Sequence, residues 1–351
     1  MLRRLFNACL LRPQDVSPSR DDMEVIGVFN PGAALTESGV VLLLRIAERP
    51  KERRTGYVPS PRWDAATKNV VVDWLKAAEI QPVDARVCTR RPAGLTRLMF
   101  ISHLRVARSR DGRKIDSIER AMLQPGNPYE EFGVEDPRIT RMGNTYFLTY
   151  VAVSRHGPAT ALASTEDFRS FRRHGIIFCT ENKDVVLFPE KIGGHHHALH
   201  RPLGATPFSK PEIWTAASPD LIHWGDHQPL LGGTEAWEIG RVGGGAPPIR
   251  TAKGWLAVYH GNDRREGDVG IGAYSAGALL LDLENPRRIL GRSGPIFAPE
   301  TEYERAGFVP DVVFPTGIVA QGETVLVYYG AADTSTAVVE FSLPALLSSM
   351  S

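Results

Sequence analysis

Short apolar strands separated by tight turns run through most of the chain, and this rhythm limits the fold more than any other feature. ALASTEDFRSF (161–171) and TAASPDLIHW (215–224) each place small residues, then serine, aspartate and an aromatic ring after an apolar run, and VARSRDG (106–112) is a shorter version. A strand, an aspartate-containing turn and another strand, recurring along a chain, are typical of propeller blades. We therefore predict an all-β fold, and a β-propeller in preference to the alternative, a β-sandwich or another barrel-like sheet.

Glycine and proline leave little room for long helices. The chain of 351 residues contains 33 Gly and 26 Pro, which interrupt runs of β-branched and aromatic residues. Only DWLKAAEI (73–80) and PALLSSM (344–350) are predicted to form short helices. The predicted strands include residues 40–48, 97–109, 145–154, 159–165, 211–219, 254–261, 274–283 and 324–334.

Most of the chain is predicted to form one domain. Residues 27–345 carry the strand rhythm, and residues 1–26 are expected to be a leader that packs on this domain. Residues 50–97 interrupt the rhythm, because they are polar, rich in Arg and Pro, and longer than a usual connection. We interpret them as a decorated insertion, which either shapes a site or covers one unit of the fold.

The charge balance argues against a nucleic acid or an anionic membrane as the main partner, because 41 basic and 40 acidic residues leave a net charge of +1. The three cysteines, Cys9, Cys88 and Cys179, are widely spaced and odd in number, which fits a reducing compartment better than a disulfide framework. The apolar start of the chain ends at Arg12, too early for a signal peptide. We predict a cytoplasmic protein, compatible with a homo-oligomer, that has no nucleic-acid or membrane partner.

Two adjacent carboxylates stand out in FGVEDPRI (132–139), where Glu135 and Asp136 lie between a glycine and a proline. Neighbouring side chains of a strand point to opposite faces, so only one of the two is expected to face a given cavity. Pro137 is expected to hold Asp136 in an extended conformation. The pair is a candidate for acid catalysis, with a solvated pair as the alternative.

A histidine-rich stretch, FPEKIGGHHHALHRP (188–202), suggests a metal site, but consecutive histidines cannot all face one ion from a strand. No HExxH segment is present, and we predict no metal. An anion site suits the stretch better, since arginine and lysine form charge-assisted hydrogen bonds with phosphate. The candidate residues are Lys183, Lys191, His200 and Arg201, with a solvated basic hairpin as the alternative.

Two further segments combine small residues with polar ends. GGGAPPIR (243–250) indicates a close backbone approach before the strand that ends at Tyr259 and His260. It is not a phosphate loop, because no GK[ST] follows. YYGAADT (328–334) contains Asp333, whose carboxylate suits two sugar hydroxyls. The chain lacks a GxSxG segment.

Together these segments resemble glycoside hydrolase family 130, the mannoside phosphorylases and mannosidases. The similarity covers most of the chain from about residue 27 and follows the family's order. The matching segments are FNPGA (29–33), LLLR (42–45), SHLRVARSRDG (102–112), GVEDPR (133–138), LFPEK (187–191), LHRP (199–202), APPI (246–249), VYHG (258–261), VVFPTG (312–317) and YYGAADT (328–334).

The resemblance implies a five-bladed β-propeller with the active site at the mouth of the central channel. It implies that Asp136 is the catalytic acid, with its proton passing through a mannose hydroxyl, and that inorganic phosphate is a co-substrate with no other cofactor. His103 stands where many members carry an arginine. The implied mannose-binding residues are Asn30, Arg45, His103, Arg105 and Asp333, and the implied phosphate-binding residues are Lys183, Lys191, Arg201, Tyr259 and His260.

The chemistry of the candidate residues favours phosphorolysis over hydrolysis. An inverting hydrolase needs a second carboxylate about 6.5–9.5 Å from the acid, with a water between them. Phosphate arrives already able to attack and needs cations to hold it in line. We therefore expect a β-mannoside phosphorylase that converts a β-1,2- or β-1,4-linked manno-oligosaccharide and phosphate into α-mannose 1-phosphate and a shortened acceptor. The alternatives are an inverting β-mannosidase and a non-catalytic propeller that binds glycans or proteins.

Overall fold

The computed structural model describes residues 1–82, 87–90, 94–203, 210–265, 267–268 and 270–350. Its strands form six sheets, so the predicted all-β class is confirmed. Within the described ranges, no helix combines the length and apolarity needed to cross a membrane. The helical elements are α1 (Glu302–Arg305), α2 (Leu343–Ser348) and the 3-10 turns η1 (Pro13–Asp15), η2 (Ala77–Glu79) and η3 (Pro128–Glu130).

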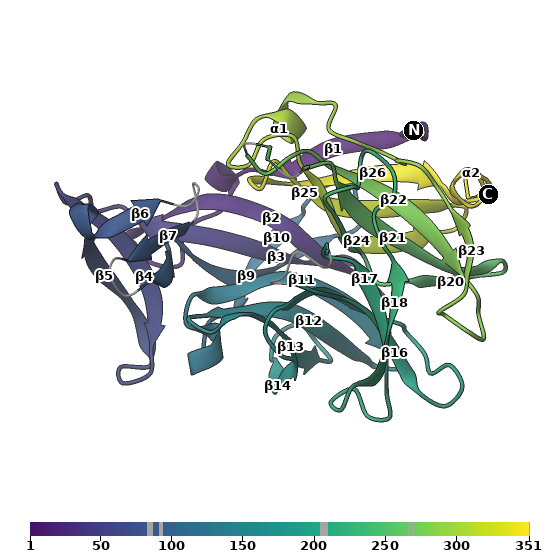
Figure 1. Cartoon of the computed structure of the whole chain (residues 1–351), viewed down its shortest axis with the longest axis horizontal. Coiled ribbons are helices and arrows are strands. Elements are labelled where there is room, and N and C mark those ends of the chain that lie inside the picture. Colours follow the sequence, from purple (N-terminus) through teal and green to yellow (C-terminus); the bar gives the residue numbers. More distant parts are fainter. Residues whose placement is uncertain (83–86, 91–93, 204–209, 266, 269, 351) are drawn as a thin grey trace.

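Five antiparallel units, named here in chain order, account for most of the strands (Figure 1). The first and second units share one sheet, because Gly133 of β11 pairs in parallel with Ser102 of β9. The first unit contains β2 (Met23–Thr36), β3 (Gly39–Pro50), β9 (Ile101–Ser109) and β10 (Ser117–Leu123), and the second contains β11 (Gly133–Met142), β12 (Thr145–Ser154), β13 (Gly157–Thr165) and β14 (Arg172–Phe178).

The remaining three units follow in sequence. The third contains β15 (Asn182–Leu187), β16 (His196–Pro202), β17 (Ile213–Ser218) and β18 (Gly225–Leu231). The fourth contains β19 (Arg241–Gly244), β20 (Ile249–Thr251), β21 (Gly254–Asn262), β22 (Tyr274–Leu281) and β23 (Ile289–Arg292). The fifth contains β24 (Val313–Gln321), β25 (Thr324–Ala331), β26 (Ser335–Ser342) and β1 (Phe6–Leu11).

The predicted repeat is a repeated turn between the last two strands of each of the first four units. In each turn, an aspartate Oδ1 accepts hydrogen bonds from the backbone N–H groups two and three residues further on. This local bonding explains why the same short pattern recurs in the sequence. The four aspartates are Asp111, Asp167, Asp220 and Asp282.

The insertion forms an arm that projects from the first unit, at the left of Figure 1. It contains the hairpin β4 (Tyr57–Asp64) and β5 (Asn69–Lys76), followed by β6 (Ile80–Pro82), β7 (Val87–Arg90) and β8 (Leu95–Leu98). The predicted helix at 73–80 is wrong. Asp73–Lys76 continues the β-branched run of β5 and pairs with β4, and only the turn η2 follows. The predicted C-terminal helix is confirmed as α2.

The hydrophobic core lies between neighbouring units. Leu256 and Val258 of β21, for example, belong to the same buried cluster as Val325 and Val327 of β25. The first strands of the units approach one another in the middle of the molecule, since β2 contacts β11 and β24, and β15 contacts β11 and β19. Residues on these first strands therefore meet although they are far apart in sequence.

The N-terminal and C-terminal parts of the described chain belong to the same sheet. Strand β1 supplies the fourth strand of the last unit by pairing with β26 (Figure 1). Beside it, Arg4 donates from Nη1 to Oε1 of Glu304 at 2.8 Å and from Nη2 to the carbonyl of Ala298 at 2.6 Å. Glu304 is fully buried. The N-terminal segment is thus paired by backbone hydrogen bonds and by a buried ion pair.

We expect Arg4→Ala to lower the free energy of unfolding by about 1–3 kcal/mol, because it leaves the buried carboxylate of Glu304 without its charged partner. Urea unfolding at neutral pH measures this loss. The matched control is Arg3→Ala, which removes an exposed neighbour and should change stability by less than about 0.5 kcal/mol. Equal effects of the two substitutions would contradict the assigned role of Arg4.

Candidate active site

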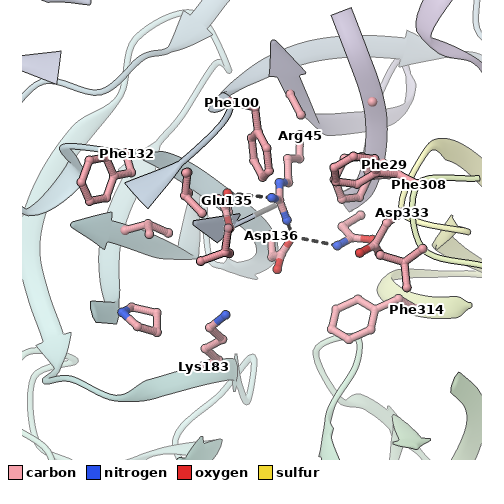
Figure 2. A pocket seen from close by; sticks show the side chains of 18 of the residues that line it. Phe29, Arg45, Phe100, Phe132, Glu135, Asp136, Lys183, Phe308, Phe314 and Asp333 are labelled. Carbon is pink, nitrogen blue, oxygen red and sulfur yellow. Dashed lines mark hydrogen bonds and ion pairs between the residues drawn. The ribbon is translucent and has the colours of Figure 1, made fainter. Parts of the chain in front are cut away.

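A cavity of about 620 Å³ opens where the first strands of the units approach one another. Small-molecule sites usually occupy about 300–1,000 Å³. Carboxylates, cations and aromatic rings all face this cavity (Figure 2). The residues that line it include Phe29, Asn30, Arg45, Phe100, Phe132, Glu135, Asp136, Lys183, Asp184, Arg201, Arg241, Arg264, Phe308, Phe314 and Asp333.

Three first strands carry the same local distortion at the cavity. Asn30, Asp136 and Asp184 have left-handed backbones, with φ of 48°, 48° and 56°. At each of them the pairing with the next strand slips, as in a β-bulge. Asn and Asp adopt this conformation more readily than other residues with a side chain. The bulges re-aim polar side chains from three units towards one space.

Both carboxylates of the Glu135 and Asp136 pair face the cavity, so the expectation that only one would do so is wrong. Alternation applies to a regular strand, and the bulge at Asp136 interrupts it. The expected extended conformation of Asp136 before Pro137 is wrong for the same reason. Arg45 joins the pair, with Nη1 2.8 Å from Oδ1 of Asp136 and Nη2 2.6 Å from Oε1 of Glu135 (Figure 2).

The surroundings of Asp136 favour its ionised form. Asn30 donates from Nδ2 to Oδ1 of Asp136 at 2.8 Å, and the Arg45 guanidinium stacks 4.5 Å from the ring centre of Phe29. Burial alone raises the pKa of Asp136, but the charges of Arg45 and Arg138, together with the hydrogen bonds, outweigh burial and lower it. Asp136 is therefore ionised in the free protein at neutral pH.

A cationic wall faces the carboxylates from the third unit. Lys183 of β15 lies opposite Arg201 of β16 in the register of the two strands, and both residues line the cavity. Arg201 Nη1 lies 2.9 Å from Oδ2 of Asp184 and 3.3 Å from Nε2 of His260. Burial lowers the pKa of Lys183, and it lowers the pKa of His260 to about 3, so His260 is neutral. Arg241 also lines the cavity.

The opposite side of the cavity combines one carboxylate with aromatic rings. Asp333 lies in the turn between β25 and β26. Burial alone lowers the pKa of Arg45, but the charges of Glu135, Asp136 and Asp333 outweigh burial and raise it. Figure 2 shows Asp333 beside Phe308, with Phe314 below and Phe29 above. Apolar faces next to hydrogen-bond acceptors are suited to a sugar ring, which has both kinds of surface.

Several sequence-predicted residues meet in this cavity. Asn30, Arg45, Asp136, Lys183, Arg201 and Asp333 line it, and His260 contacts Arg201 from behind. Two predicted phosphate ligands lie elsewhere. Lys191 is exposed in the loop between β15 and β16, beyond the end of the hairpin that is remote from Lys183. Tyr259 follows the alternation of β21, so it faces away from the cavity and donates its hydroxyl to Glu238.

The two predicted sugar ligands on β9 also lie outside the cavity wall. His103 is buried, with Nδ1 3.9 Å from Oε2 of Glu48, and burial lowers its pKa to about 3. Arg105 donates from Nη1 to the carbonyl of Ser17 at 2.8 Å. Arg45 of β3 lies opposite Leu104 of β9, so the flanking residues His103 and Arg105 point to the other face of the sheet.

Sequence reasoning missed Arg138, Asp184, Arg241 and Arg264. A signal existed for Asp184, since KDV at 183–185 occupies the same place on β15 as FNP at 29–31 on β2 and EDP at 135–137 on β11. Comparing the first strands with one another, rather than the turns, would have found it. In the described part of the chain no group of three or more His, Cys, Asp or Glu residues is arranged to hold a metal ion.

The chain is similar to a protein family model and to characterised proteins. Residues 96–351 match the family model Glyco_hydro_130, described as β-1,4-mannooligosaccharide phosphorylase. The chain is 41% identical to a β-1,2-mannobiose phosphorylase of Listeria innocua, over 96% of this chain and 95% of that protein. It is 34% identical to a β-1,4-mannooligosaccharide phosphorylase of Ruminococcus albus, over 57% of this chain and 59% of that protein.

The structure is also similar to solved structures. It matches the Listeria innocua β-1,2-mannobiose phosphorylase in complex with β-1,2-mannobiose with a TM-score of 0.90 and 40% identity, over 97% of this chain and 96% of that chain. A mannose phosphorylase from Leishmania mexicana, in complex with phosphate, shares the fold with a TM-score of 0.61 at 14% identity, over 98% and 90% of the two chains.

We expect Gly330→Ala to disturb the bond between Asn30 and Asp136. A Cβ at Gly330 would overlap Oδ1 of Asn30, and close packing leaves no room to absorb it. The free energy of unfolding should fall by about 1–3 kcal/mol, and the pKa of Asp136 should rise because Asn30 no longer stabilises its ionised form. Urea unfolding and a carboxyl titration by NMR measure both effects. Gly294→Ala, where a Cβ meets nothing within 4 Å, is the matched control and should change neither.

Proposed function

The chain belongs to glycoside hydrolase family 130, and from this membership and its cavity we propose that it is an inverting β-mannoside phosphorylase. The observation that carries the proposal is one cavity with an orientated carboxylate, Asp136, on one side and the cations Lys183 and Arg201 on the other. Phosphate bound by these cations attacks the anomeric carbon of mannose. The products are α-mannose 1-phosphate and the shortened acceptor.

We assign the sugar-binding role to Asn30, Arg45 and Asp333, and the phosphate-binding role to Lys183 and Arg201 with support from His260. Arg241 and Arg264 add positive charge to the same cavity. Asp184, the carboxylate within the cationic wall, is tied to Arg138 and Arg201, so it is not free to act as a base for water. Lys191, Tyr259, His103 and Arg105 are not assigned to either site, because they do not line the cavity.

The ionised state of Asp136 in the free protein has to change before it acts as an acid. Phosphate brings negative charge into the cavity and offsets the cations that lower the pKa of Asp136. The proton balance agrees with this order. Hydrogen phosphate dianion becomes a sugar phosphate dianion, so the phosphate gives up one proton overall and the acceptor oxygen gains one. The proton therefore enters with the phosphate and passes to the acceptor by way of Asp136.

We propose that the five units are the blades of a single five-bladed propeller with the active site at the mouth of its channel. The propeller consists of the predicted domain, residues 27–345, together with the start of β2 and with β1, which belongs to the last unit and is not a separate leader. The recurring aspartate turns and the pairing of β1 with β26 support this arrangement, since the last blade of such a ring is completed by the other end of the chain. Three cysteines without disulfides favour the cytoplasm. The absence of a nucleic-acid or membrane partner stays a prediction from the charge balance.

The substrate class follows from the relatives. The β-1,2-mannobiose phosphorylase matches this chain almost end to end, so β-1,2-mannobiose is the first substrate to test, with β-1,4-linked manno-oligosaccharides second. The arm supplies Val87, Thr96 and Leu98 to the cavity wall. We propose that these residues shape the side on which the acceptor sugar binds.

Incubation of the purified protein with β-1,2-mannobiose tests the function directly. We expect mannose release only when phosphate is present, with α-mannose 1-phosphate formed in equal amount, as followed by ³¹P NMR. Release that does not depend on phosphate would instead identify a β-mannosidase. If no β-mannoside releases mannose, and no mannoside forms from α-mannose 1-phosphate in the reverse reaction, a non-catalytic glycan-binding protein is favoured.

Asp136→Asn should lower kcat by at least about 10²–10⁴-fold, because general acid catalysis contributes that much and the amide cannot supply the proton. Glu135→Gln is the matched control on the neighbouring residue. Its side chain still accepts hydrogen bonds from Arg45 and Ser102, so its kcat should fall much less. A larger loss for Glu135→Gln than for Asp136→Asn would reverse the assignment of the acid.

A further inference from the structure

A buried carboxylate stands inside the wall that we assign to phosphate. Asp184 is 1% exposed, has a left-handed backbone and lines the cavity next to Lys183. Burial alone raises its pKa, but the charge of Arg201 and other cations outweighs burial and lowers it. A fixed negative charge in this place opposes the binding of an anion. A carboxylate that repels phosphate in a phosphate site therefore needs a second role that favours phosphate binding.

The two oxygens of Asp184 hold cations on two sides. Oδ2 lies 2.9 Å from Nη1 of Arg201 and 3.5 Å from Nε2 of His260. Oδ1 accepts a hydrogen bond from Nη2 of Arg138 at 3.1 Å. Arginine side chains are long and rotatable, so a carboxylate that fixes one end determines where the remaining N–H groups point. Asp184 thereby fixes the orientation of Arg201 in the cavity.

Arg138 carries the connection to the acid. It is 2% exposed, and its Nη1 donates to the backbone carbonyl of Asp136 at 2.8 Å, while Nε donates to the carbonyl of Gly245 at 3.1 Å. The side chain thus links the bulge of β11, which aims Asp136, to the segment after β19 and to Asp184 on β15. A buried path of contacts therefore runs from the backbone of Asp136 through Arg138 and Asp184 to Arg201.

The glycines of GGGAPP make room for the same group. A Cβ at Gly243 would lie 2.5 Å from Oδ2 of Asp184 and 2.7 Å from Nε2 of His260. Its backbone does not require glycine, since its φ lies outside the left-handed region. The sequence feature that indicated a close backbone approach is thus explained by the space that Asp184 and His260 occupy.

We propose that Asp184 is a positioning residue that orients Arg201 for phosphate and, through Arg138, keeps the bulge of Asp136 in register with it. The inference rests on the proposed phosphorylase function. In this proposal, the cavity binds phosphate opposite the acid because of where Asp184 is placed. The charge of Asp184 alone does not account for the binding.

Two substitutions separate geometry from charge. Asp184→Asn keeps the shape and removes the charge, whereas Asp184→Glu keeps the charge and displaces it. If Asp184 positions Arg201, both variants should raise the Kd for phosphate, measured by calorimetry, by about tenfold or more. KM for the mannoside should change by less than about twofold in both, so the KM for phosphate and the KM for the mannoside respond differently.

The matched control is Asp226→Asn, which removes an exposed aspartate with φ of 51° and an ion pair to Arg287, away from the cavity. It should leave the Kd for phosphate unchanged. Gly243→Ala provides an independent variant if Asp184→Asn fails to fold. It should weaken phosphate binding in the same way, because it displaces Asp184 without altering any charge.

Three results would overturn the proposal. Tighter phosphate binding by Asp184→Asn would show that the carboxylate acts only through its charge. Wild-type affinity in Asp184→Glu would show that its position is unimportant. A lowered Tm with unchanged phosphate affinity would show a purely structural role. Failure of the proposed function has a different signature, since wild-type protein would then bind no phosphate and release no mannose.

Discussion

The interaction on which the site depends is the buried bridge from Arg45 to Glu135 and Asp136. Two carboxylates side by side repel each other, and their charges are costly to bury. The guanidinium offsets both costs, because its planar donors reach one oxygen of each carboxylate. It also fixes the direction of the Asp136 carboxylate, and Asn30 donates a hydrogen bond to the same carboxylate from the neighbouring strand.

The bulges on the first strands make that bridge possible. In a regular strand, the side chain of Asp136 would point to the opposite face from that of Glu135. Asn30 and Asp184 would likewise point to the opposite face from the residues that precede them. Left-handed backbones at these three positions store strain that the surrounding packing has to support. Buried hydrogen bonds from Arg138, which spans β11, β15 and the segment after β19, supply part of this support. The distortions therefore bring polar side chains of three units to one cavity.

Charge is distributed across the cavity in a way that suits the transfer of a sugar between two oxygens. The carboxylates and Arg45 occupy the side of the first two units, and Lys183 and Arg201 occupy the side of the third. Arg45 and Arg138 lower the pKa of Asp136 in the free protein, and an anion bound nearby would raise it, so anion binding would favour proton uptake. This coupling gives a physical reason for phosphate, which carries an exchangeable proton, as the second substrate.

The sequence by itself determined the all-β class, the aspartate turns and several of the polar residues that line the cavity, since these depend on local bonding and on recognisable segments. It misjudged residues 73–76, where pairing with β4 overrides a helical pattern. Only the tertiary structure decided that Glu135 and Asp136 face the same way, that Tyr259 and Lys191 face elsewhere, and that Asp184 joins Arg201 to Arg138. A bulge depends on the register between neighbouring strands, and the contact between first strands depends on how whole units pack. Neither can be recognised within one short segment of sequence.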